Sequence, residues 1–502
     1  MVRIARLSLP MLLLAASLNA AEDEAVSRHQ ISVAGKPLHY TARAGFMPLY
    51  SSARELKARI FYVAYTLDRA AESKPRPVTF AWNGGPGSSA ALLHLGALGP
   101  RRVKSPDEYA TPPPPYQLAD NESTWLDMTD LVLVDPVGTG YSFAVRPEFN
   151  KEFWSVQGDI DSIGEFIRIY LTRFDAGRAP VFIVGESYGT LRAAGLAETM
   201  VNRGIPLNGV ILISSILNFQ LTASRPGNDL PYALLLPSFT ATAFAHKKLP
   251  AEMQSNFEET VKKAEAWAET EYMQALMKGD RLTEQERKSV GAQMARYIGI
   301  DANVLEKNNL RISRDQFAKL LLADRKQMVA HYDTRMSGPL VASEGPYDPR
   351  KDPSLTSDGT STAIVSYLRS ELGFKTDAMY AGPFGGGYPS PTSFRGDWMS
   401  MRWDYQLGPG GGYIDRTDSL RRAMQENSAI RVFIASGYFD LATPHFATDY
   451  TLSHMGLDPK LRRNIVVTRY RGGHAVYLDK EVRTQFKQDI AAFIRDTIKE
   501  VK

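Results

Sequence analysis

Compact apolar runs separated by polar turns dominate the first half of the chain. Residues 31–65 have the pattern of short strands, which is clearest over residues 58–65. Runs bounded by Gly, Asp, Asn or Ser predict buried strands at residues 78–82, 131–134, 181–184 and 210–213. Helical patterns fall between several of them, as over residues 159–174. Since the strands are apolar on both faces, this alternation predicts a mostly parallel sheet covered by helices.

The pattern changes after about residue 218. Residues 250–330 have a helical pattern, with Thr283 and Glu286 as a candidate capping box and Gly279 as a candidate helix end. Residues 337–412 are rich in loop formers and carry glycine clusters at 385–387 and 410–412. Neither cluster follows a strand or opens a helix with Lys-Ser or Lys-Thr, so we interpret both as loops rather than phosphate sites.

Strand–helix alternation resumes towards the C-terminus, with a helix near 420–425, strands near 431–436 and 465–468, and a final helix over about 482–498. One α/β core interrupted by a long insertion accounts for this order. We therefore expect a first core part at 22–218, a largely helical cap or insertion at 219–417 and a second core part at 418–502.

The first residues have the pattern of a secretory signal peptide. Arg3 and Arg6 precede an apolar run over residues 7–18, and Asn19-Ala20-Ala21 leads into an acidic stretch. We expect a signal peptide at 1–21 and an exported protein, periplasmic or secreted. The alternative is an uncleaved membrane anchor, for which the apolar run is short.

Composition narrows the function classes. The chain has 502 residues, 44% of them hydrophobic, and 59 basic against 55 acidic residues. This near-neutral balance does not favour nucleic acid or an anionic membrane as partner. The chain has no cysteine, which excludes a thiol nucleophile, a Cys-ligated metal site and disulfides. A bacterial periplasm fits these facts.

Residues 181–200 carry the main candidate for chemistry. The predicted strand at 181–184 runs into Gly185-Glu-Ser-Tyr-Gly189, and a helical pattern follows over residues 191–200. Strand, Gly-x-Ser-x-Gly and helix in this order are typical of a nucleophile elbow, in which a sharp turn exposes the serine hydroxyl. Ser187 is therefore the candidate nucleophile.

A serine nucleophile needs an adjacent base, and the chain offers eight histidines. In a fold built around such an elbow, the acid and then the base follow late strands, in the order Ser, Asp, His. Asp440 follows the strand near 431–436, and His474 follows the strand near 465–468. These residues complete a candidate catalytic triad.

Three nearby residues compete for these roles. His445 follows Pro444 without a strand of its own, Asp479 comes after the presumed base, and His94 lies in a predicted helix. We interpret all three as structural or surface residues.

The developing oxyanion needs backbone donors, normally the N–H after the nucleophile and one from a loop after an earlier strand. Tyr188 supplies the first. The second comes from Trp82-Asn-Gly-Gly-Pro-Gly87, which directly follows the strand at 78–82, and Gly85 is the candidate within it.

Five ordered blocks of the sequence resemble the serine carboxypeptidases of the carboxypeptidase Y type. They are Asn83-Gly-Gly-Pro-Gly-Ser-Ser89, Asp135-Pro-Val-Gly-Thr-Gly-Tyr-Ser142, Gly185-Glu-Ser-Tyr-Gly189, Gly437-Tyr-Phe-Asp440 and Gly473-His474. The resemblance implies an α/β-hydrolase fold, in which the insertion takes the place of the family's cap domain. It also implies removal of residues from peptide C-termini without a metal or organic cofactor.

The resemblance further implies a site for the substrate's terminal carboxylate, formed by Asn83 and Gly84 with help from Glu186. In the family this Glu is paired with a second Glu, and the two share a proton. Ala97 stands at the partner position here. We therefore expect Glu186 to ionise at lower pH than a paired Glu, with weaker carboxylate recognition or a shifted pH optimum as the consequence.

Other family positions also differ. Ser88 and Thr443 stand where Cys is common, and Thr190-Leu-Arg192 replaces the usual Gly and aromatic residues. The peptide side chains that the enzyme would prefer are therefore left open, as is the oligomeric state.

Three functions remain. The first is a carboxypeptidase acting on peptides with a free C-terminus, without nucleic acid or stable membrane insertion. The second is an esterase, acyltransferase or other peptidase with the same triad, which the missing partner of Glu186 keeps open. The third is a binding protein on a hydrolase scaffold, against which an intact triad argues.

Overall fold

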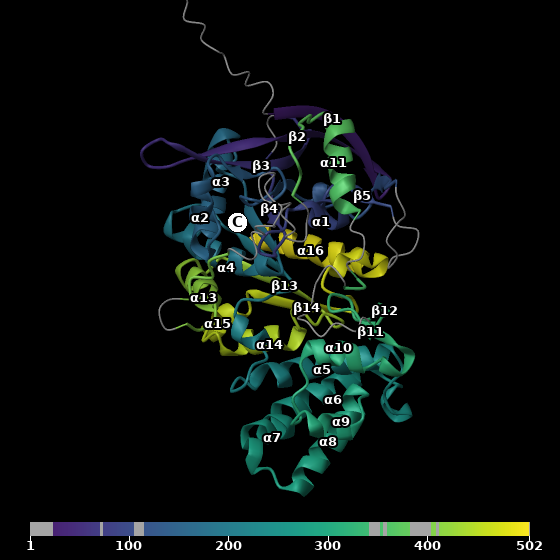
Figure 1. Cartoon of the computed structure of the whole chain (residues 1–502). Helices are drawn as coiled ribbons and strands as arrows, with labels where there is room; N and C mark the ends of the chain where they lie inside the picture. Colours follow the sequence, from purple (N-terminus) through teal and green to yellow (C-terminus); the bar gives the residue numbers. More distant parts are fainter. Residues whose placement is uncertain are drawn as a thin grey trace, which may run out of the picture.

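A ten-stranded sheet forms the centre of the molecule in this computed structural model (Figure 1). The structure describes residues 24–70, 74–104, 115–340, 352–354, 359–381, 403–407 and 411–500. The strands of the sheet are β1 (Glu24–Val33), β2 (Lys36–Tyr50), β3 (Leu56–Leu67), β4 (Val78–Trp82), β7 (Asp130–Val134), β8 (Phe143–Ala144), β9 (Val181–Glu186), β10 (Gly209–Ile213), β13 (Arg431–Gly437) and β14 (Ile465–Tyr470).

The sheet is antiparallel at one edge and parallel over the rest. Its order is β1-β2-β3-β7-β4-β9-β10-β13-β14, with β8 also paired to β3. β1 to β3 form an antiparallel meander that joins β7, and every pairing from β7 to β14 is parallel. β4, β9 and β10 are buried along their whole length, as expected for strands covered on both faces. The predicted mostly parallel sheet is confirmed.

Helices cover both faces of the sheet. On one face lie α3 (Val156–Arg173), α4 (Tyr188–Asn202) and α13 (Thr417–Glu426); on the other lie α1 (Ala91–Leu93), α11 (Thr360–Ser370) and α16 (Lys480–Glu500) (Figure 1). In α16 the residues Phe486, Ile490 and Phe493 recur at helical spacing, and all three are buried against the sheet.

α11 was not predicted, because its region was expected to consist of loops. Ile364 and Leu368 repeat four residues apart along this helix and are buried in the same apolar cluster as α16. Tertiary packing thus gives helical structure to a segment whose flanks are rich in loop formers.

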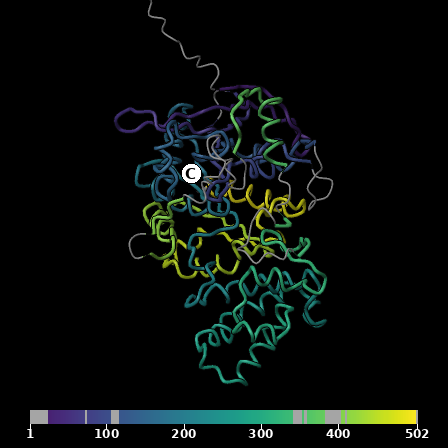
Figure 2. The backbone as a smooth tube through the Cα atoms, viewed as in Figure 1, coloured from purple at the N-terminus to yellow at the C-terminus, as the bar shows by residue number. Residues whose placement is uncertain are grey.

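Six helices between β10 and α11 form a separate body at one end of the molecule (Figure 2). They are α5 (Leu230–Ala245), α6 (Phe257–Trp267), α7 (Met273–Lys278), α8 (Glu284–Ile298), α9 (Ala302–Lys307) and α10 (Arg314–Leu320). Their apolar cluster includes the stacked rings of Phe239 and Phe317, whose centroids lie 4.0 Å apart. Leu441 and Phe446 join this cluster, so the body is packed onto the segment that follows β13.

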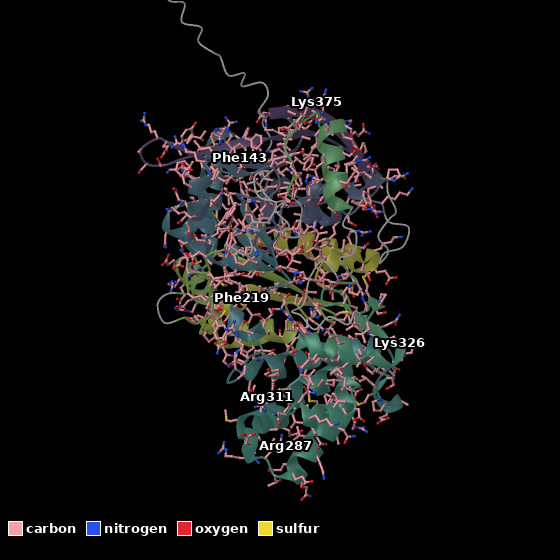
Figure 3. The ribbon with its side chains drawn as sticks, in the orientation of Figure 1. Phe143, Phe219, Arg287, Arg311, Lys326 and Lys375 are labelled. Carbon is pink, nitrogen blue, oxygen red and sulfur yellow. The ribbon has the colours of Figure 1, made fainter. Side chains whose placement is uncertain are left out.

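The polar surface of this body is also ordered. The predicted capping box of Thr283 and Glu286 is present at the start of α8, and Gly279 follows α7 directly, as expected. The guanidinium of Arg311 donates two hydrogen bonds to the carboxylate of Asp229, from Nε to Oδ1 and from Nη2 to Oδ2, each 2.7 Å long. Arg287 and Arg311 mark this end of the molecule, and Phe143 and Lys375 mark the opposite end (Figure 3).

The described residues also form other elements. They include α2 (Asn150–Phe153), α14 (His445–His454), α15 (Pro459–Arg462), π-helices at His94–Leu98 and Ala268–Tyr272, and the two-stranded pairs β5 (Arg101–Val103) with β6 (Leu118–Asp120) and β11 (Gln327–Val329) with β12 (Ser337–Pro339).

Several sequence predictions fall outside the described residues. These are the signal peptide at 1–21 and the glycine cluster at 385–387; of the second cluster, Gly411 and Gly412 are described and lie in a loop, as predicted. Among the helices that the structure describes, none is both long enough and apolar enough to cross a bilayer.

Candidate active site

Ser187 stands at the turn between β9 and α4. Its φ of 57° lies in the left-handed region, which a residue with a side chain rarely adopts. The backbone is held there by a hydrogen bond from the Ser187 N–H to the carbonyl of Ile213, at 2.9 Å. A strained serine between a strand and a helix is the geometry of a nucleophile elbow.

The two glycines of the elbow are required by close packing. A Cβ atom at Gly185 would lie 2.0 Å from the carbonyl oxygen of Gly189. A Cβ at Gly189 would lie 3.0 Å from the carbonyl oxygen of Asn83. The strand, the helix and the neighbouring loop can therefore pack this closely around Ser187 only because positions 185 and 189 have no side chain.

His474 and Asp440 meet in the loops that follow β14 and β13. Nδ1 of His474 lies 2.7 Å from Oδ2 of Asp440, and both side chains are buried. Burial opposes ionisation of Asp440, but the charge of His474 and hydrogen bonds from His474 and Thr443 hold its pKa below the usual range. Burial lowers the pKa of His474, but the Asp440 carboxylate outweighs it, and the net pKa is raised.

The two loops meet because glycines allow it. A Cβ at Gly437 would lie 2.2 Å from the carbonyl oxygen of Gly473, and a Cβ at Gly473 would lie 2.4 Å from the carbonyl oxygen of Tyr332. This accounts for the glycines that precede Asp440 and His474 in the sequence.

Thr443 is a site residue whose role the sequence analysis missed. Its hydroxyl donates to Oδ2 of Asp440 at 2.6 Å, while the N–H groups of Ala442 and Thr443 donate to Oδ1 at 2.7 and 3.0 Å. The Asp-x-x-Thr spacing was the available signal, because an aspartate commonly accepts from N–H groups two and three residues on.

Tyr332 was missed as well, and no local pattern indicates it. Its carbonyl accepts from the N–H of His474 at 2.5 Å, and its ring meets the imidazole edge-on at a centroid distance of 5.1 Å. Tyr332 follows β11, so the segment after the six-helix body helps to hold the candidate base.

The loop that carries Asn83 runs directly against the elbow. A Cβ at Gly84 would lie 2.6 Å from the backbone nitrogen of Tyr188 and 2.9 Å from Cβ of Ser187. Tyr188 is the first residue of α4, so its N–H has no acceptor within the helix. Gly85 follows with a φ of 106°, which favours glycine. The candidate oxyanion donors, Gly85 and Tyr188, thus belong to two segments in contact.

Glu186 is buried beside the candidate nucleophile. Its Oε2 accepts from the hydroxyl of Tyr477 at 2.5 Å, and the Asn83 side chain also bonds to it. Burial raises the pKa of Glu186 to about 7, against opposing effects of His474, Tyr477 and Asn83. From the missing carboxylate at Ala97, Glu186 was predicted to ionise at lower pH than a paired Glu. Desolvation, which is invisible in the sequence, acts in the opposite direction and raises its pKa.

Asn83 is fixed from three sides. Its Oδ1 accepts from the N–H of Leu93 at 3.0 Å, and its carbonyl accepts from the guanidinium of Arg192 at 2.9 Å. Since Oδ1 is engaged with Leu93, the side-chain amide nitrogen is the donor towards Glu186.

The three competing residues have structural partners. His94 Nε2 pairs with the hydroxyl of Tyr65 at 2.6 Å in the core, and burial lowers its pKa to about 3. His445 Nε2 lies 3.1 Å from the carboxylate of Glu265, and Asp479 forms an ion pair with Arg335 at 3.1 Å. These contacts account for all three without a role in catalysis.

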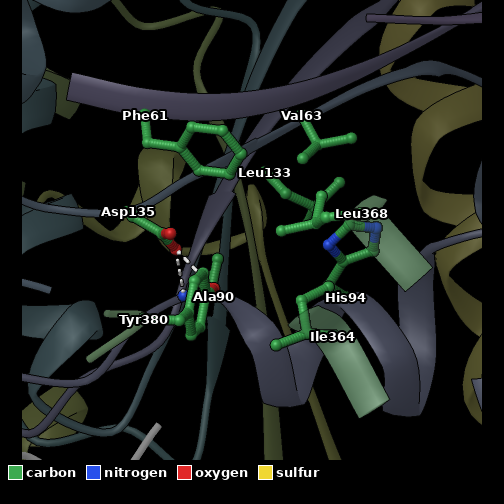
Figure 4. Close-up of a pocket in the computed structure, with 9 residues that line it drawn as sticks. All are labelled: Phe61, Val63, Ala90, His94, Leu133, Asp135, Ile364, Leu368 and Tyr380. Carbon is green, nitrogen blue, oxygen red and sulfur yellow. Dashed lines mark hydrogen bonds between the residues drawn. The ribbon is translucent and has the colours of Figure 1, made fainter. Parts of the chain in front are cut away.

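A small buried cluster surrounds Asp135 behind the Asn83 loop (Figure 4). Asp135 Oδ1 accepts from the N–H of Ala90 at 2.8 Å and from the hydroxyl of Tyr380 at 3.4 Å. Burial raises the pKa of Asp135 to about 7. The space between these side chains is too small for a water molecule. They therefore form a packed core beneath the loop rather than a ligand site.

Among the described residues, no group of three or more His, Asp or Glu side chains has an arrangement that could hold a metal ion.

Residues 34–331, more than half of the chain, match the family model for serine carboxypeptidases. The chain belongs to the serine carboxypeptidase family. The matched residues include Ser187 and the Asn83 loop and end before Asp440 and His474, so the assignment of these two rests on their geometry.

Curated relatives of the family match over short segments. Serine carboxypeptidase-like 51 of Arabidopsis thaliana is 31% identical over 170 residues, which cover 31% of this chain and 33% of the relative. The pheromone-processing carboxypeptidase KEX1 of Puccinia graminis f. sp. tritici is 26% identical over 157 residues, which cover 30% of this chain and 22% of the relative. The chain thus spans a third or less of the length of these two relatives.

Structural similarity covers much more of the chain than those matched segments. The crystal structure of a prohormone-processing carboxypeptidase KEX1 from Saccharomyces cerevisiae superposes with a TM-score of 0.55 and 15% identity, covering 91% of each chain. This similarity shows the fold, and the expected α/β-hydrolase fold is confirmed.

Proposed function

We propose that this member of the serine carboxypeptidase family removes C-terminal residues from peptides through an acyl-enzyme on Ser187. The observation that carries the proposal is the hydrogen bond between Nδ1 of His474 and Oδ2 of Asp440, 2.7 Å long and buried. β9, β13 and β14 are parallel strands, so Ser187, Asp440 and His474 all follow the carboxyl ends of strands at one edge of the sheet.

In the proposed first step, Nε2 of His474 takes the proton of Ser187 as Oγ attacks the carbonyl carbon of the last peptide bond. Asp440 keeps the proton of His474 on Nδ1 and stabilises the imidazolium. The N–H groups of Gly85 and Tyr188 stabilise the oxyanion. His474 then protonates the leaving nitrogen, and the C-terminal amino acid departs.

In the second step, water replaces the leaving group. His474 removes a proton from the water as its oxygen attacks the acyl carbon, and the same donors stabilise the second oxyanion. Return of the proton to Ser187 Oγ releases the shortened peptide and restores the enzyme. No further group is required for these steps.

The terminal carboxylate of the peptide would be held by Asn83, Gly84 and Glu186. Burial raises the pKa of Glu186 to about 7. Below that pH the neutral acid can donate to a carboxylate, and above it the ionised group repels one. We therefore expect hydrolysis of free-acid peptides to decline as the pH rises through about 7.

We further propose an insertion at residues 219–417 between core parts at 22–218 and 418–502, in which the six helices α5 to α10 form the cap and α11 packs on the sheet. We also propose export directed by residues 1–21. The separate apolar cluster of the six helices and the contact of Tyr332 with His474 support a cap that borders the site. N-terminal sequencing of protein recovered from the periplasm of a bacterial host tests the export proposal; a mature chain that begins near residue 22 is expected.

The decisive experiment compares a blocked dipeptide with a free C-terminal carboxylate, its amide-capped twin and a simple ester, from pH 4 to 8. We expect fast cleavage of the free acid and poor cleavage of the amide, with no turnover by Ser187→Ala. Ser162→Ala, which removes a buried hydroxyl within α3, is the matched control. Turnover of the ester alone would move the function to an esterase with the same triad. A wild-type enzyme that no fluorophosphonate labels would indicate a binding protein instead.

A further inference from the structure

Glu186 has an unusual partner, the buried phenol of Tyr477. The Tyr477 hydroxyl donates to Oε2 of Glu186 at 2.5 Å, across 291 positions of sequence. Tyr477 is fully buried, and burial together with the Glu186 charge raises its pKa well above the usual range. The phenol therefore keeps its proton at every pH at which the enzyme would work and acts as a permanent donor to Glu186.

The segment around Ala97 leaves the space that this ring fills. A Cβ at Gly96 would lie 2.9 Å from Cε2 of Tyr477. Gly96 belongs to the π-helix at His94–Leu98, which carries no acidic side chain. A larger residue at position 96 would push the ring, and with it the hydroxyl, away from Glu186.

A donor on one oxygen of a carboxylic acid decides where the acid keeps its proton. Oε2 accepts the Tyr477 hydrogen bond. When Glu186 is neutral, Oε2 is thus favoured as the carbonyl oxygen and Oε1 as the hydroxyl. An acid of this kind offers one O–H donor, which suits a negatively charged acceptor such as a carboxylate.

We propose that Tyr477 positions Glu186 for recognition of the peptide's terminal carboxylate, by fixing the Glu186 proton on Oε1. This inference rests on the proposed carboxypeptidase function. Tyr477 is fully buried and bonds to Glu186 and to the side chain of Asn83, so it is a positioning residue rather than a catalytic one.

Other groups also act on Glu186. Within the candidate triad, His474 lowers the pKa of Glu186 and Asp440 raises it. Asn83 bonds to Glu186 from the neighbouring loop and lowers its pKa. The contribution of the triad is common to free-acid and amide substrates. The ratio of kcat/KM for the free acid to kcat/KM for the amide therefore isolates the carboxylate site.

The test measures this ratio from pH 5 to 9 in the wild type and in Tyr477→Phe. We expect the variant to lower the ratio roughly tenfold, the effect of losing one hydrogen bond to an ionisable group. The Tyr477 hydrogen bond favours ionised Glu186. Its loss should therefore also move the pH at which the ratio declines upward, a shift that a purely structural role would not produce.

Three further variants complete the test. Gly96→Ala should change the ratio in the same direction by displacing the ring. In a Glu186→Gln background, which has no acid to position, Tyr477→Phe should lower the ratio clearly less than in the wild type, and only the part that acts through Asn83 should remain. Tyr272→Phe removes another buried phenol, one that donates to Leu310, and should leave both the ratio and its pH dependence as in the wild type.

The outcomes separate this inference from the function on which it rests. A wild type that does not discriminate between acid and amide overturns both. A wild type that discriminates, with an unchanged ratio and midpoint in Tyr477→Phe and in Gly96→Ala, overturns the role of Tyr477 alone. Equal losses on both substrates, without a pH shift, also overturn it.

Discussion

Nε of Arg192 donates to Oδ2 of Asp159 at 2.7 Å, and neither side chain has more than 3% of its surface exposed. This ion pair joins α4 to α3. A second nitrogen of the same guanidinium donates to the carbonyl of Asn83. The pair therefore connects the helix after the candidate nucleophile to the loop with the candidate oxyanion and carboxylate groups.

Arg192→Met is expected to lower the free energy of unfolding by about 3–5 kcal/mol, because it leaves a buried carboxylate without a partner. The loss should be larger at pH 8 than at pH 5, where the unpaired Asp159 can take up a proton. Urea unfolding at both pH values measures it. The double variant Arg192→Met/Asp159→Leu should recover most of the loss; a single variant that loses under 1 kcal/mol would contradict this account.

The support of Asp440 by Thr443 can be tested by kinetics. Thr443→Val keeps the shape but removes the donor to Oδ2, and we expect kcat/KM to fall roughly tenfold. Asp440→Asn should cost about ten-thousandfold, because the histidine then takes the wrong tautomer. Thr451→Val, which removes a buried hydroxyl bonded to Ala447, is the matched control. Equal rates in Thr443→Val and the control would remove Thr443 from the site.

The close packing of the elbow predicts the effect of one methyl group. Gly185→Ala brings a Cβ to 2.0 Å from a backbone oxygen that cannot move without shifting α4. We expect a loss of about 3 kcal/mol in stability and slower fluorophosphonate labelling of Ser187. At Gly177 a Cβ meets nothing within 4 Å, so Gly177→Ala should change stability by less than about 1 kcal/mol. Similar behaviour of the two variants would argue against the elbow geometry.

Asp135 should make stability depend on pH. Burial raises its folded-state pKa to about 7, far above that of an unfolded chain, so the folded state binds this proton more tightly. The resulting stabilisation is fully present below about pH 4 and is lost as the pH rises through 7, by up to about 4 kcal/mol. Asp135→Asn should make this decline clearly shallower in urea unfolding from pH 4.5 to 8.5, while Glu186, whose pKa is also raised to about 7, continues to contribute in the same range. The partly exposed Asp161→Asn should leave it in place, and an unchanged slope in Asp135→Asn would show that Asp135 is not its source.

Local patterns in the sequence determined much of the core. The strand predicted at residues 78–82 coincides with β4, and those at 181–184 and 210–213 fall within β9 and β10. Strands buried on both faces must be continuously apolar, and that requirement is visible within five or six residues. The elbow was predicted for a related reason: its glycines are neighbours in sequence as well as in space.

Contacts between distant segments were decided by the tertiary structure. α11 is helical where the flanking sequence suggested loops, because Ile364 and Leu368 are buried against the sheet. Tyr332 contacts His474 although 142 positions separate them in the sequence. Tyr477 contacts Glu186 across a separation of 291 positions. Such pairs leave no periodicity and no fixed spacing in the chain.

The charge state of Glu186 also depends partly on the sequence and partly on the tertiary structure. The sequence determined that a glutamate precedes the candidate nucleophile and that Ala97 offers it no carboxylate. The pKa of that glutamate depends on how much water reaches it and on which donors face it. Only the folded chain decides both, because desolvation and hydrogen bonding come from side chains that are brought together by packing.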